Sequence, residues 1–462
     1  MRILLVQVPT SHFGSKERVY PLGLARLSAL VPKTIDKHAI DMNLYPDPWF
    51  KLQQTLLEYS PTIVALSFRN LDPLAGHQVS YLSSLKTSAL MTRLLIPNAR
   101  ILAGGPAFSL FGKRLMLEIP EIDYGLIGEG ESVFAQLLTE PFSPETICGL
   151  IWRKKNCIKQ NQPCPYLSMD KLPRIDTATF IPEHYLKENQ YVAAIGIEGK
   201  RGCDLKCTYC IYPCLGGRRM RLRNPKNIVD EIESLNKAHD INLFHFTDAV
   251  LNRPADHFNA VCEEIIQRKI NISWTGFFRE DTLTEKSASM AAKAGLAAVY
   301  FSADALCDHG LNILNKHLSI KDILKASQIT TKTGLLTICH FLVNLPGETD
   351  EHIRQSKDLL NRIIDIHMHA GNLGAVIFNN IRLYPGASLT KKLIKEHLLD
   401  PSMDLLYPVY YNPPERSHII HELQTHCHMA GVFSRLKIPT CTEKAMEKKM
   451  IEVPKENKRH RQ

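Results

Sequence analysis

The chain has 462 residues, a net charge of +9 and 44% hydrophobic residues. This length exceeds the usual size of one hydrophobic core, so we expect two domains and a smaller piece. The positive charge is spread along the chain, apart from 218–226 and the tail, so a nucleic-acid partner is not expected. Because no apolar run is long enough for a signal peptide or a membrane span, we expect a cytoplasmic protein without a membrane partner. Its twelve cysteines are then expected to be thiols or metal ligands rather than disulfides.

Residues 1–140 are expected to form an N-terminal α/β domain. Short apolar runs that end in turn or polar residues predict strands at 2–8, 38–43, 62–68, 99–105 and 124–130. Helical stretches such as GLARLSALV separate these runs. The pattern predicts a doubly wound parallel sheet of five strands.

The rest of the chain divides into three further parts. Residues 141–188 are rich in proline and polar residues and predict a connector with a hairpin near 149–160. Residues 189–390 predict a partial (β/α)6 barrel, with strands at 191–198, 243–248, 273–278, 297–303, 336–343 and 375–383. Asn224 and Pro225 predict the start of one of its helices. Residues 391–462 are expected to be mostly helical and to end in a basic, disordered tail.

The stretch KRGCDLKCTYCIYPC at 200–214 places Cys203, Cys207 and Cys210 at C-x3-C-x2-C spacing. Thiolates at this spacing can occupy three corners of an iron–sulfur cube and leave one iron without a protein ligand. A zinc site would normally need a fourth ligand from a separate knuckle. Cys214 could close a four-ligand site, but Pro213 and the diglycine after it favour a turn that carries Cys214 away as a small buried thiol.

With Tyr209 before the third cysteine, this stretch resembles the cluster loop of the radical S-adenosylmethionine (SAM) enzymes. The resemblance implies that the three cysteines hold a [4Fe-4S] cluster, that SAM chelates the open iron and that Tyr209 packs beside the adenine. The segments FHFTDAVLNRP, VYFSADAL, FLVNLPGETDE and NNIRLYPGASL resemble later parts of the same family in the same order. By this resemblance Asp248, Ser302 and Asp304 contact SAM, although the fourth strand departs from the commoner Glu-Ser-Gly. Arg279 is a further candidate, with a surface salt bridge as the alternative.

The N-terminal domain, with YPLGLARLSALV and DYGLIGEGESVFAQLL, resembles the cobalamin-binding domain fused ahead of many radical SAM enzymes. The resemblance implies a cobalamin site at the carboxyl ends of the strands, with contacts from Arg69, Asn70, Gly104, Gly105, Gly128, Glu129 and Gly130. SFRNLDP stands where a D-x-H-x-x-G motif would supply a histidine, and we interpret His77 as non-ligating. Arg69 is then the candidate for the lower cobalt face, because a guanidinium has no lone pair and could only exclude solvent.

The resemblance implies a cobalamin-dependent radical SAM methyltransferase that acts on an unactivated carbon or phosphorus centre of a small molecule or peptide. In such enzymes a 5′-deoxyadenosyl radical removes a substrate hydrogen and methylcobalamin supplies the methyl group. The partner would be an external electron donor of the flavodoxin or ferredoxin type. A cobalamin-dependent radical cyclase or ring-rearranging enzyme is an alternative, and a non-catalytic cobalamin sensor is a third. Methylthio transfer to RNA fits poorly, because the N-terminal domain has no second three-cysteine motif.

Two further motifs precede and follow the cluster stretch. Cys148, Cys157 and Cys164 are spaced loosely on the connector, and we interpret them as incidental. The run RRMRLR at 218–223 is interpreted as a solvated loop or a domain seam, with a clamp for an anionic substrate as the alternative.

The C-terminal region contains two patterns that suggest a site. Tyr407, Tyr410 and Tyr411 are candidates for the mouth of a substrate cavity. The residues HCH at 426–428 could suggest a metal site, but side chains at i and i+2 of a helix point apart. We therefore expect a packed helix face there.

Overall fold

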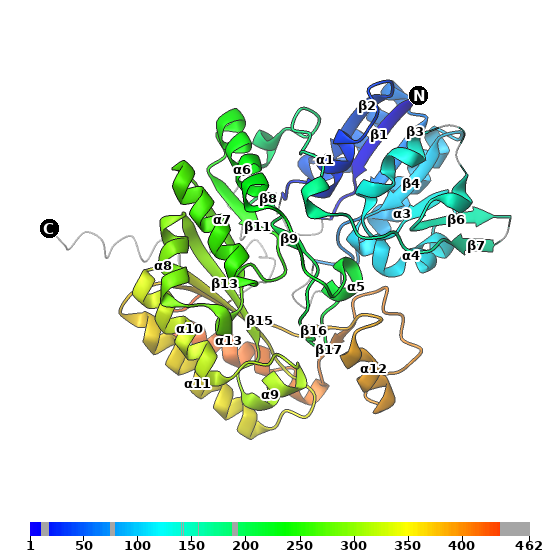
Figure 1. The fold of residues 1–462 in the computed structure, drawn as a ribbon. Helices are drawn as coiled ribbons and strands as arrows, with labels where there is room; N and C mark the ends of the chain where they lie inside the picture. Colours follow the sequence, from blue (N-terminus) through cyan, green and yellow to red (C-terminus); the bar gives the residue numbers. More distant parts are fainter. Residues whose placement is uncertain are drawn as a thin grey trace.

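The computed structural model describes residues 1–10, 18–73, 79–139, 141, 143–155, 157–186 and 193–434. His77, predicted to be non-ligating, and the basic tail, predicted to be disordered, lie outside the described residues. Figure 1 shows two sheets, one in blue and cyan and one in green to yellow, with the orange C-terminal region beside the second. Within the described ranges, no helix is both long and apolar enough to cross a bilayer.

The N-terminal sheet has seven strands in the order β2-β1-β3-β4-β5-β6-β7. The strands are β1 (Arg2–Gln7), β2 (Asp36–Asp41), β3 (Ile63–Ser67), β4 (Arg100–Gly104), β5 (Tyr124–Leu126), β6 (Leu150–Lys154) and β7 (Cys157–Gln160). The first five are parallel, which confirms the predicted doubly wound sheet. The predicted hairpin also forms, but it pairs antiparallel with β5 and extends the sheet instead of standing apart as a connector.

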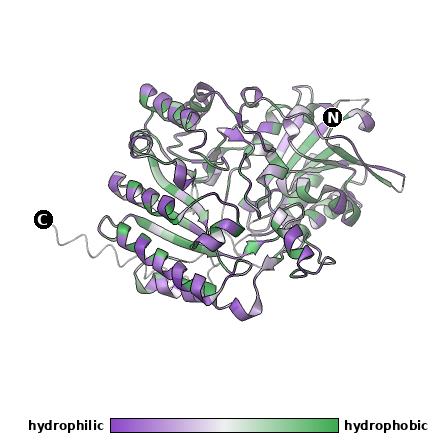
Figure 2. Cartoon of the chain, turned by 60° about the horizontal axis from the view of Figure 1, so that its bottom comes forward, coloured by the Kyte–Doolittle hydropathy of each residue, from purple (hydrophilic) through white to green (hydrophobic). Residues whose placement is uncertain are grey.

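Helices cover both faces of the N-terminal sheet. They are α1 (Leu22–Ala29), α2 (Pro48–Tyr59), α3 (Leu82–Leu95) and α4 (Pro106–Glu118). Alternate residues of β1 enter different cores: Ile3 packs with α1, whereas Leu4 packs with the other three helices. The α2 helix begins where the Asp47 carboxylate accepts backbone N–H groups. In Figure 2 the strands are largely green and the outer helix faces largely purple, as this alternation requires.

The second sheet is parallel, with six strands in the order β15-β14-β13-β12-β11-β8. The strands are β8 (Ile195–Ile197), β11 (Leu243–Phe246), β12 (Ser273–Phe278), β13 (Leu296–Asp304), β14 (Leu336–Leu342) and β15 (Leu373–Asn379). The connecting helices are α6 (Pro225–His239), α7 (Ala255–Arg268), α8 (Glu285–Lys293), α9 (Asp308–Ile313), α10 (Ile320–Thr333) and α11 (Asp350–Met368). The predicted helix cap is confirmed, since the Asn224 side chain accepts from the Lys226 N–H. The edges of the sheet are β8 and β15, as expected for a partial barrel.

The inner face of this second sheet, which we call the lumen, has its own small apolar cluster. Ala298, Tyr300, Ile338, Ala375 and Ile377 form it, separate from the large core that the helices share with the outer face. The rings of His245, Phe277, Tyr300 and His340 meet on this face. Burial lowers the pKa of both histidines to about 4, so the lumen wall is uncharged near neutral pH.

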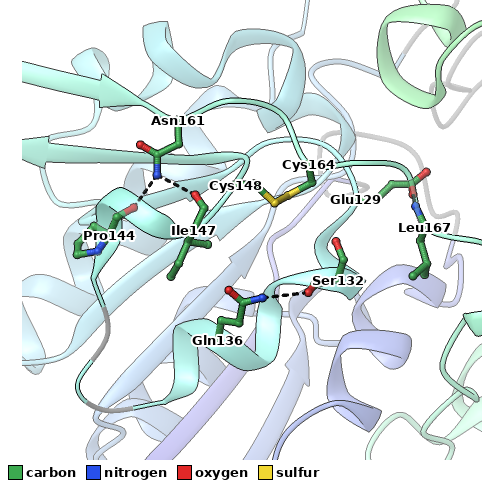
Figure 3. The surroundings of a disulfide bond; sticks show 9 residues. All are labelled: Glu129, Ser132, Gln136, Pro144, Ile147, Cys148, Asn161, Cys164 and Leu167. Carbon is green, nitrogen blue, oxygen red and sulfur yellow. Dashed lines mark hydrogen bonds between the residues drawn. A yellow bond between two sulfur atoms is a disulfide. The ribbon is translucent and has the colours of Figure 1, made fainter.

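Cys148 and Cys164 form a disulfide, which corrects the expectation that the connector cysteines are incidental thiols. Figure 3 shows the bond beside the hairpin. The chain leaving β7 returns along the start of β6, where the Gly149 N–H donates to the Gln162 carbonyl and the Asn161 N–H to the Leu150 carbonyl. This return brings the two Cα atoms to 4.9 Å, within the usual range for a disulfide. Cys157 is a free, exposed thiol.

The C-terminal region packs against the end of the barrel. It contains β16 (Ile381–Arg382), α12 (Ser388–Lys395), β17 (Tyr410–Tyr411) and α13 (Ile419–Met429). Cys427 of α13 is buried in the large core, and the neighbouring His426 and His428 are half-buried. The packed face expected at 426–428 is therefore confirmed.

Candidate cluster and cofactor site

The three cysteines of the predicted motif lie on one loop, residues 202–211, which we call the cluster loop. It follows β9 (Lys200–Arg201) and precedes α5 (Tyr212–Gly216). Its backbone is anchored on three sides. The Cys203 N–H donates to the Gly217 carbonyl, and the Thr208 N–H donates to the Leu314 carbonyl at the end of α9. The Leu389 N–H of α12 donates to the Thr208 carbonyl. These bonds hold the loop over the carboxyl ends of the barrel strands.

The thiols of the cluster loop are close enough to influence one another. Cys203 is buried and Cys207 and Cys210 are half-buried. Burial raises the pKa of all three, that of Cys210 to about 12; neighbouring thiols add to the effect at Cys203 and Cys210, and Asp304 adds to it at Cys207. Cys214 lies in α5 and is exposed, so the prediction of a turn that carries it away agrees with the structure, but the prediction that it is buried is wrong.

Asp248 holds the entry to the cluster loop. It follows β11, is almost fully buried, and its Oδ1 accepts from the Gly199 and Lys200 N–H groups at 2.8 and 3.1 Å. Its Oδ2 has no hydrogen-bond partner among the described residues but lies 3.7 Å from the Lys200 ammonium, and burial raises the pKa of this carboxyl to about 6. The predicted cofactor contact therefore lies beside the loop and is paired with Lys200.

Tyr209 and Asp304 are brought together with a residue that the sequence did not indicate, Lys316. The Tyr209 hydroxyl donates to Asp304. The Lys316 ammonium lies 2.6 Å from the Asp304 carboxylate, donates to the Ser302 carbonyl at 2.6 Å, and lies 5.9 Å from the centre of the Tyr209 ring. Asp304 has a left-handed backbone, with φ of 61°. A buried ion pair thus fixes the ring that precedes the third cysteine.

Arg279 and Glu280 lie at the end of β12. Arg279 is 4% exposed, pairs with Asp281 at 2.8 Å and donates to the carbonyls of Lys316 and His317. It is therefore a buried support for the Lys316 segment, which corrects the alternative of a surface salt bridge. Neither carboxylate oxygen of Glu280 has a hydrogen-bond partner among the described residues, and burial raises the pKa of this carboxyl to about 7.

Four side chains with unpaired polar atoms define what we call the barrel mouth. They follow or end strands β11, β12, β14 and β15, and the unpaired atoms are oxygens of Asp248, Glu280, Asn344 and Asn379. Buried polar atoms normally find partners within a protein. The carboxyl ends of barrel strands are where enzymes of this architecture gather functional groups. Asn344 and Asn379 therefore have unused acceptor oxygens where a ligand is expected, whereas Glu280 is enclosed by outer-core residues such as Phe301, Ile323 and Cys339.

The carboxyl edge of the N-terminal sheet carries the residues predicted for cobalamin. Arg69 and Asn70 follow β3 and are half-buried. The positive charge of Arg69 lowers the pKa of Tyr212, at the start of α5, against the larger opposing effect of burial. Arg69 therefore lies on the side of the N-terminal sheet that faces the cluster loop.

The predicted glycines have different roles. A Cβ on Gly105 would lie 2.6 Å from the Phe68 carbonyl oxygen, so this glycine lets the loops after β3 and β4 approach each other. Gly104 ends β4 and Gly130 begins a short 3₁₀ turn. Gly128 is exposed, with φ of 83° and open space where a Cβ would point. Of the four, Gly128 best presents bare backbone to a ligand.

Glu129 is not presented to a ligand but is paired with arginine. Arg221, in β10 (Arg221–Leu222), donates to both of its oxygens. Glu131 pairs with Arg201 at 2.6 Å, and Arg201 also pairs with Glu198. The loop after β5 is thus bound to the two strands that flank the cluster loop.

The same network continues on the other side of Glu198. Arg26 of α1 is fully buried and pairs with Glu198 and, through two nitrogens, with Glu231 of α6. Arg223 pairs with Glu231 as well. We call this network the domain seam; its members are Arg26, Glu129, Glu131, Glu198, Arg201, Arg221, Arg223 and Glu231. The run RRMRLR therefore contributes to a domain seam, as one of its predicted interpretations required.

Residues 197–360 match the family model of the Radical SAM superfamily. This segment runs from the end of β8 into α11 and contains the cluster loop, Asp304 and Lys316. The chain therefore contains a domain of the radical SAM superfamily.

Two curated relatives give the range of similarity. An uncharacterized methyltransferase of Pyrococcus horikoshii is 25% identical over 409 residues, which cover 86% of this chain and 84% of the relative. The anaerobic magnesium-protoporphyrin IX monomethyl ester cyclase of Rubrivivax gelatinosus is 28% identical over 283 residues, which cover 56% of this chain and 48% of the cyclase. The methyltransferase matches along nearly the full chain, whereas the cyclase matches over about half of its own length.

A solved structure of the radical SAM methyltransferase TsrM from Kitasatospora setae, with tryptophan and a SAM analogue bound, has the same fold. The TM-score is 0.77 at 21% identity, and the match covers 92% of this chain and 89% of that one. A second TsrM structure, with cobalamin and a [4Fe-4S] cluster bound, has a TM-score of 0.70 at 23% identity and covers 86% and 75% of the two chains. The predicted two-sheet architecture is therefore confirmed over most of the chain.

The residues of the cluster loop fit the cofactors of a radical SAM domain, a [4Fe-4S] cluster and SAM. Three thiols on one loop, with the exposed Cys214 apart, would leave one iron corner of a bound cluster without a protein ligand. The exposed backbone at Gly128 stays a predicted contact for cobalamin on the N-terminal sheet.

Sequence reasoning missed several members of the site because their partners are distant along the chain. Lys316 is 12 residues from Asp304, and Glu129 is 92 residues from Arg221. A signal for the seam was present, since RRMRLR has no acidic neighbour of its own and EGE at 129–131 has no basic one. No comparable signal indicated Asn344 or Glu280.

Proposed function

We propose that this chain is a cobalamin-dependent radical SAM methyltransferase that transfers a methyl group to an unactivated carbon or phosphorus centre of a small molecule or peptide. An external donor of the flavodoxin or ferredoxin type would supply the electrons. When bound, the cluster and SAM supply a radical that removes a substrate hydrogen, and cobalamin supplies the methyl group. The relatives named as methyltransferases support this function.

The main observation in support of the proposal is that the carboxyl edge of the N-terminal sheet lies against the carboxyl edge of the barrel sheet. Glu129 and Glu131, in the loop after β5 of the N-terminal sheet, are bound to Arg221 and Arg201 on either side of the cluster loop. A cofactor on the N-terminal edge would therefore face the barrel mouth across one shared space. Methyl transfer to a substrate radical requires this arrangement, because the substrate must contact both reaction centres in turn.

The residues of this chain have distinct roles in the proposal. Cys203, Cys207 and Cys210 hold the cluster, and Lys316 fixes Asp304 and Tyr209 where SAM would lie. The apolar lumen excludes water, which protects a reactive intermediate from side reactions. Arg69 lies on the cobalamin side, where its guanidinium offers no lone pair to a metal.

Anaerobic reconstitution with iron, sulfide and hydroxocobalamin tests the proposal. With SAM, a one-electron reductant and candidate substrates, we expect both S-adenosylhomocysteine and 5′-deoxyadenosine, measured by mass spectrometry. Purified material that holds zinc, or a cluster with four protein thiolates, would remove the basis of the proposal.

The cyclase relative supports a second candidate, a radical reaction without methyl transfer. The same assay distinguishes the two, because a cyclase would form 5′-deoxyadenosine but no S-adenosylhomocysteine. A methyltransferase that does not cleave SAM through a radical would form only S-adenosylhomocysteine.

A further inference from the structure

The lumen-facing rows of β14 and β15 end in amide side chains. On β15, Ala375 and Ile377 belong to the lumen cluster, and Asn379 continues the same alternation at the end of the strand. On β14, the lumen residue Ile338 is followed at the same alternation by His340 and Leu342, and Asn344 comes just past the strand. The Val343 N–H donates to the Asn379 carbonyl at 2.9 Å, so the two chain ends lie side by side.

Each of these amides leaves a buried oxygen without a partner. Asn344 is 0% exposed, and its nitrogen donates to the Asn412 side-chain oxygen at 2.7 Å. Asn380 donates to the same Asn412 oxygen at 3.3 Å. The Oδ1 atoms of Asn344 and Asn379 have no hydrogen-bond partner among the described residues. Leaving a buried acceptor unpaired costs about 1–3 kcal/mol. The unpaired oxygens therefore indicate a ligand-binding position, because they do not contribute to the stability of the fold.

The backbone at Asn344 supports this interpretation. Its φ is 60°, in the left-handed region, which residues other than glycine adopt only at a cost in free energy. Asparagine tolerates this conformation better than most residues, and it turns the side chain toward the C-terminal region, where it meets Asn412. Strained residues of this kind are concentrated at functional sites. The conformation thus places a buried amide between the end of β14 and the C-terminal region.

The lumen wall that leads to the two amides along β14 and β15 is apolar and aromatic. The lumen below them is lined by the rings of His245, Phe277, Tyr300 and His340. The nearest acidic group in sequence, Glu348, already accepts the Leu345 N–H at 2.8 Å. An ammonium group placed here would meet two neutral acceptors, which do not offset the desolvation of a charge.

We propose that Asn344 and Asn379 form a recognition subsite that accepts hydrogen bonds from a neutral N–H or O–H donor on a flat, largely apolar substrate. This inference rests on the proposed function, because it assigns the substrate class of that same site. The two acceptors orient one edge of the substrate, and the aromatic wall of the lumen supports its face. The adenine amine of SAM is also a neutral N–H donor. The experiment must therefore distinguish binding of a substrate from binding of the adenine amine.

The test compares two probes that differ only in the donor, indole and 1-methylindole. Their dissociation constants are measured by equilibrium dialysis against the anaerobically reconstituted full chain. We expect indole to bind about tenfold more tightly than 1-methylindole, as one hydrogen bond to a buried acceptor would produce. In Asn379→Leu, and separately in Asn344→Gly, which tolerates the positive φ, the ratio should fall to about one. Asn312→Leu, on the exposed surface of α9, should keep the wild-type ratio.

Several outcomes would overturn the inference. Equal binding of the two probes by the wild type, no binding of either, or a ratio that persists in both variants would each do so. A loss of SAM affinity in the variants with an unchanged probe ratio would assign the amides to the adenine amine instead. The assay needs no turnover, so a chain that forms no S-adenosylhomocysteine can still show the discrimination. The subsite and the proposed function therefore fail separately.

Discussion

The domain seam and the barrel mouth both bury polar side chains, and they differ in how they satisfy them. At the seam each of the four glutamates lies within hydrogen-bond distance of an arginine. At the mouth Asn344 and Asn379 each keep an oxygen without a hydrogen-bond partner among the described residues. Paired groups hold domains in place, whereas unpaired ones are available to a ligand. Substitutions at the seam should therefore reduce stability, and substitutions at the mouth should alter binding.

The largest effect is expected where the mouth meets the cluster loop. Cys207→Ala removes one of three ligands, and we expect it to abolish incorporation of a [4Fe-4S] cluster during anaerobic reconstitution. Iron and sulfide content per chain and the electron paramagnetic resonance signal of the reduced protein measure this. Cys214→Ala is the matched control and should retain the cluster. Equal loss of iron in both variants would mean that four thiols bind it.

At the seam, Glu231→Gln should strongly reduce stability. The change leaves Arg26 and Arg223 buried without their shared counter-charge, and breaking a buried pair costs about 3–5 kcal/mol. Urea denaturation of the full chain measures the free energy of unfolding. The surface pair of Glu285 with Lys332 is the control, because Glu285→Gln should cost about 1 kcal/mol or less. Similar losses in the two variants would contradict the distinction between seam and surface.

Glu280 follows β12 but is enclosed by outer-core residues, so we expect Glu280→Gln to act on stability and to increase it at high pH. Burial raises the pKa of the Glu280 carboxyl from its ordinary value of 4.5 to about 7. Between these values the unfolded chain ionises and the folded chain does not, so stability falls as pH rises through that window. From pH 5 to pH 8 the wild type should lose about 3 kcal/mol more than the variant. Unfolding curves at the two pH values that shift equally in both proteins would disprove the expectation.

The Lys316 contact should affect SAM rather than the fold. Lys316→Met keeps the length of the side chain but leaves Asp304 without its cation, and we expect SAM to bind about tenfold more weakly to the reconstituted protein. Equilibrium dialysis gives the affinity, and the change in the cluster resonance on adding SAM provides a second readout. Lys332→Met, on the surface of α10, should behave as the wild type. Unchanged SAM affinity would show that Lys316 only supports the loop.

The smallest effect is expected on the N-terminal side. Arg69→His would offer a lone pair to cobalt, and the absorption bands of bound cobalamin should shift. Arg93→His, which lies in α3 and pairs with Asp123, should leave the spectrum unchanged. Identical spectra for all three proteins would count against a position for Arg69 beside the cobalt.

Much of the fold could be predicted from the sequence because its signals are local. Apolar runs predicted β12 to the residue and most other strands within a few residues, and Asn224 indicated a helix start that the structure confirms. The Cys148–Cys164 disulfide could not be predicted, because it depends on how the chain leaving β7 returns beside β6. Pairing across long separations, as at Glu129 and Arg221, leaves no periodic pattern to recognise.

The site was predicted unevenly for the same reason. The cysteine spacing and Tyr209 are contiguous and were recognised, whereas Lys316 contacts Asp304 only after the chain turns through α9. Asn344 and Asn379 belong to different strands and become neighbours only through the sheet. Functional residues that lie on one loop can be recognised from the sequence, whereas residues that come together from several strands cannot.

The seam also bears on how such a chain could have been inherited. Arginines and glutamates from both halves form ion pairs at Arg26, Glu129 and Glu198. Either half on its own would therefore expose to solvent several charged side chains that are buried and paired in the whole chain. Recombination that replaced one half with the corresponding domain of a distant homologue would leave some of these charged side chains without their partners. The two halves are therefore expected to have been transmitted together as a single evolutionary unit, rather than exchanged as interchangeable modules.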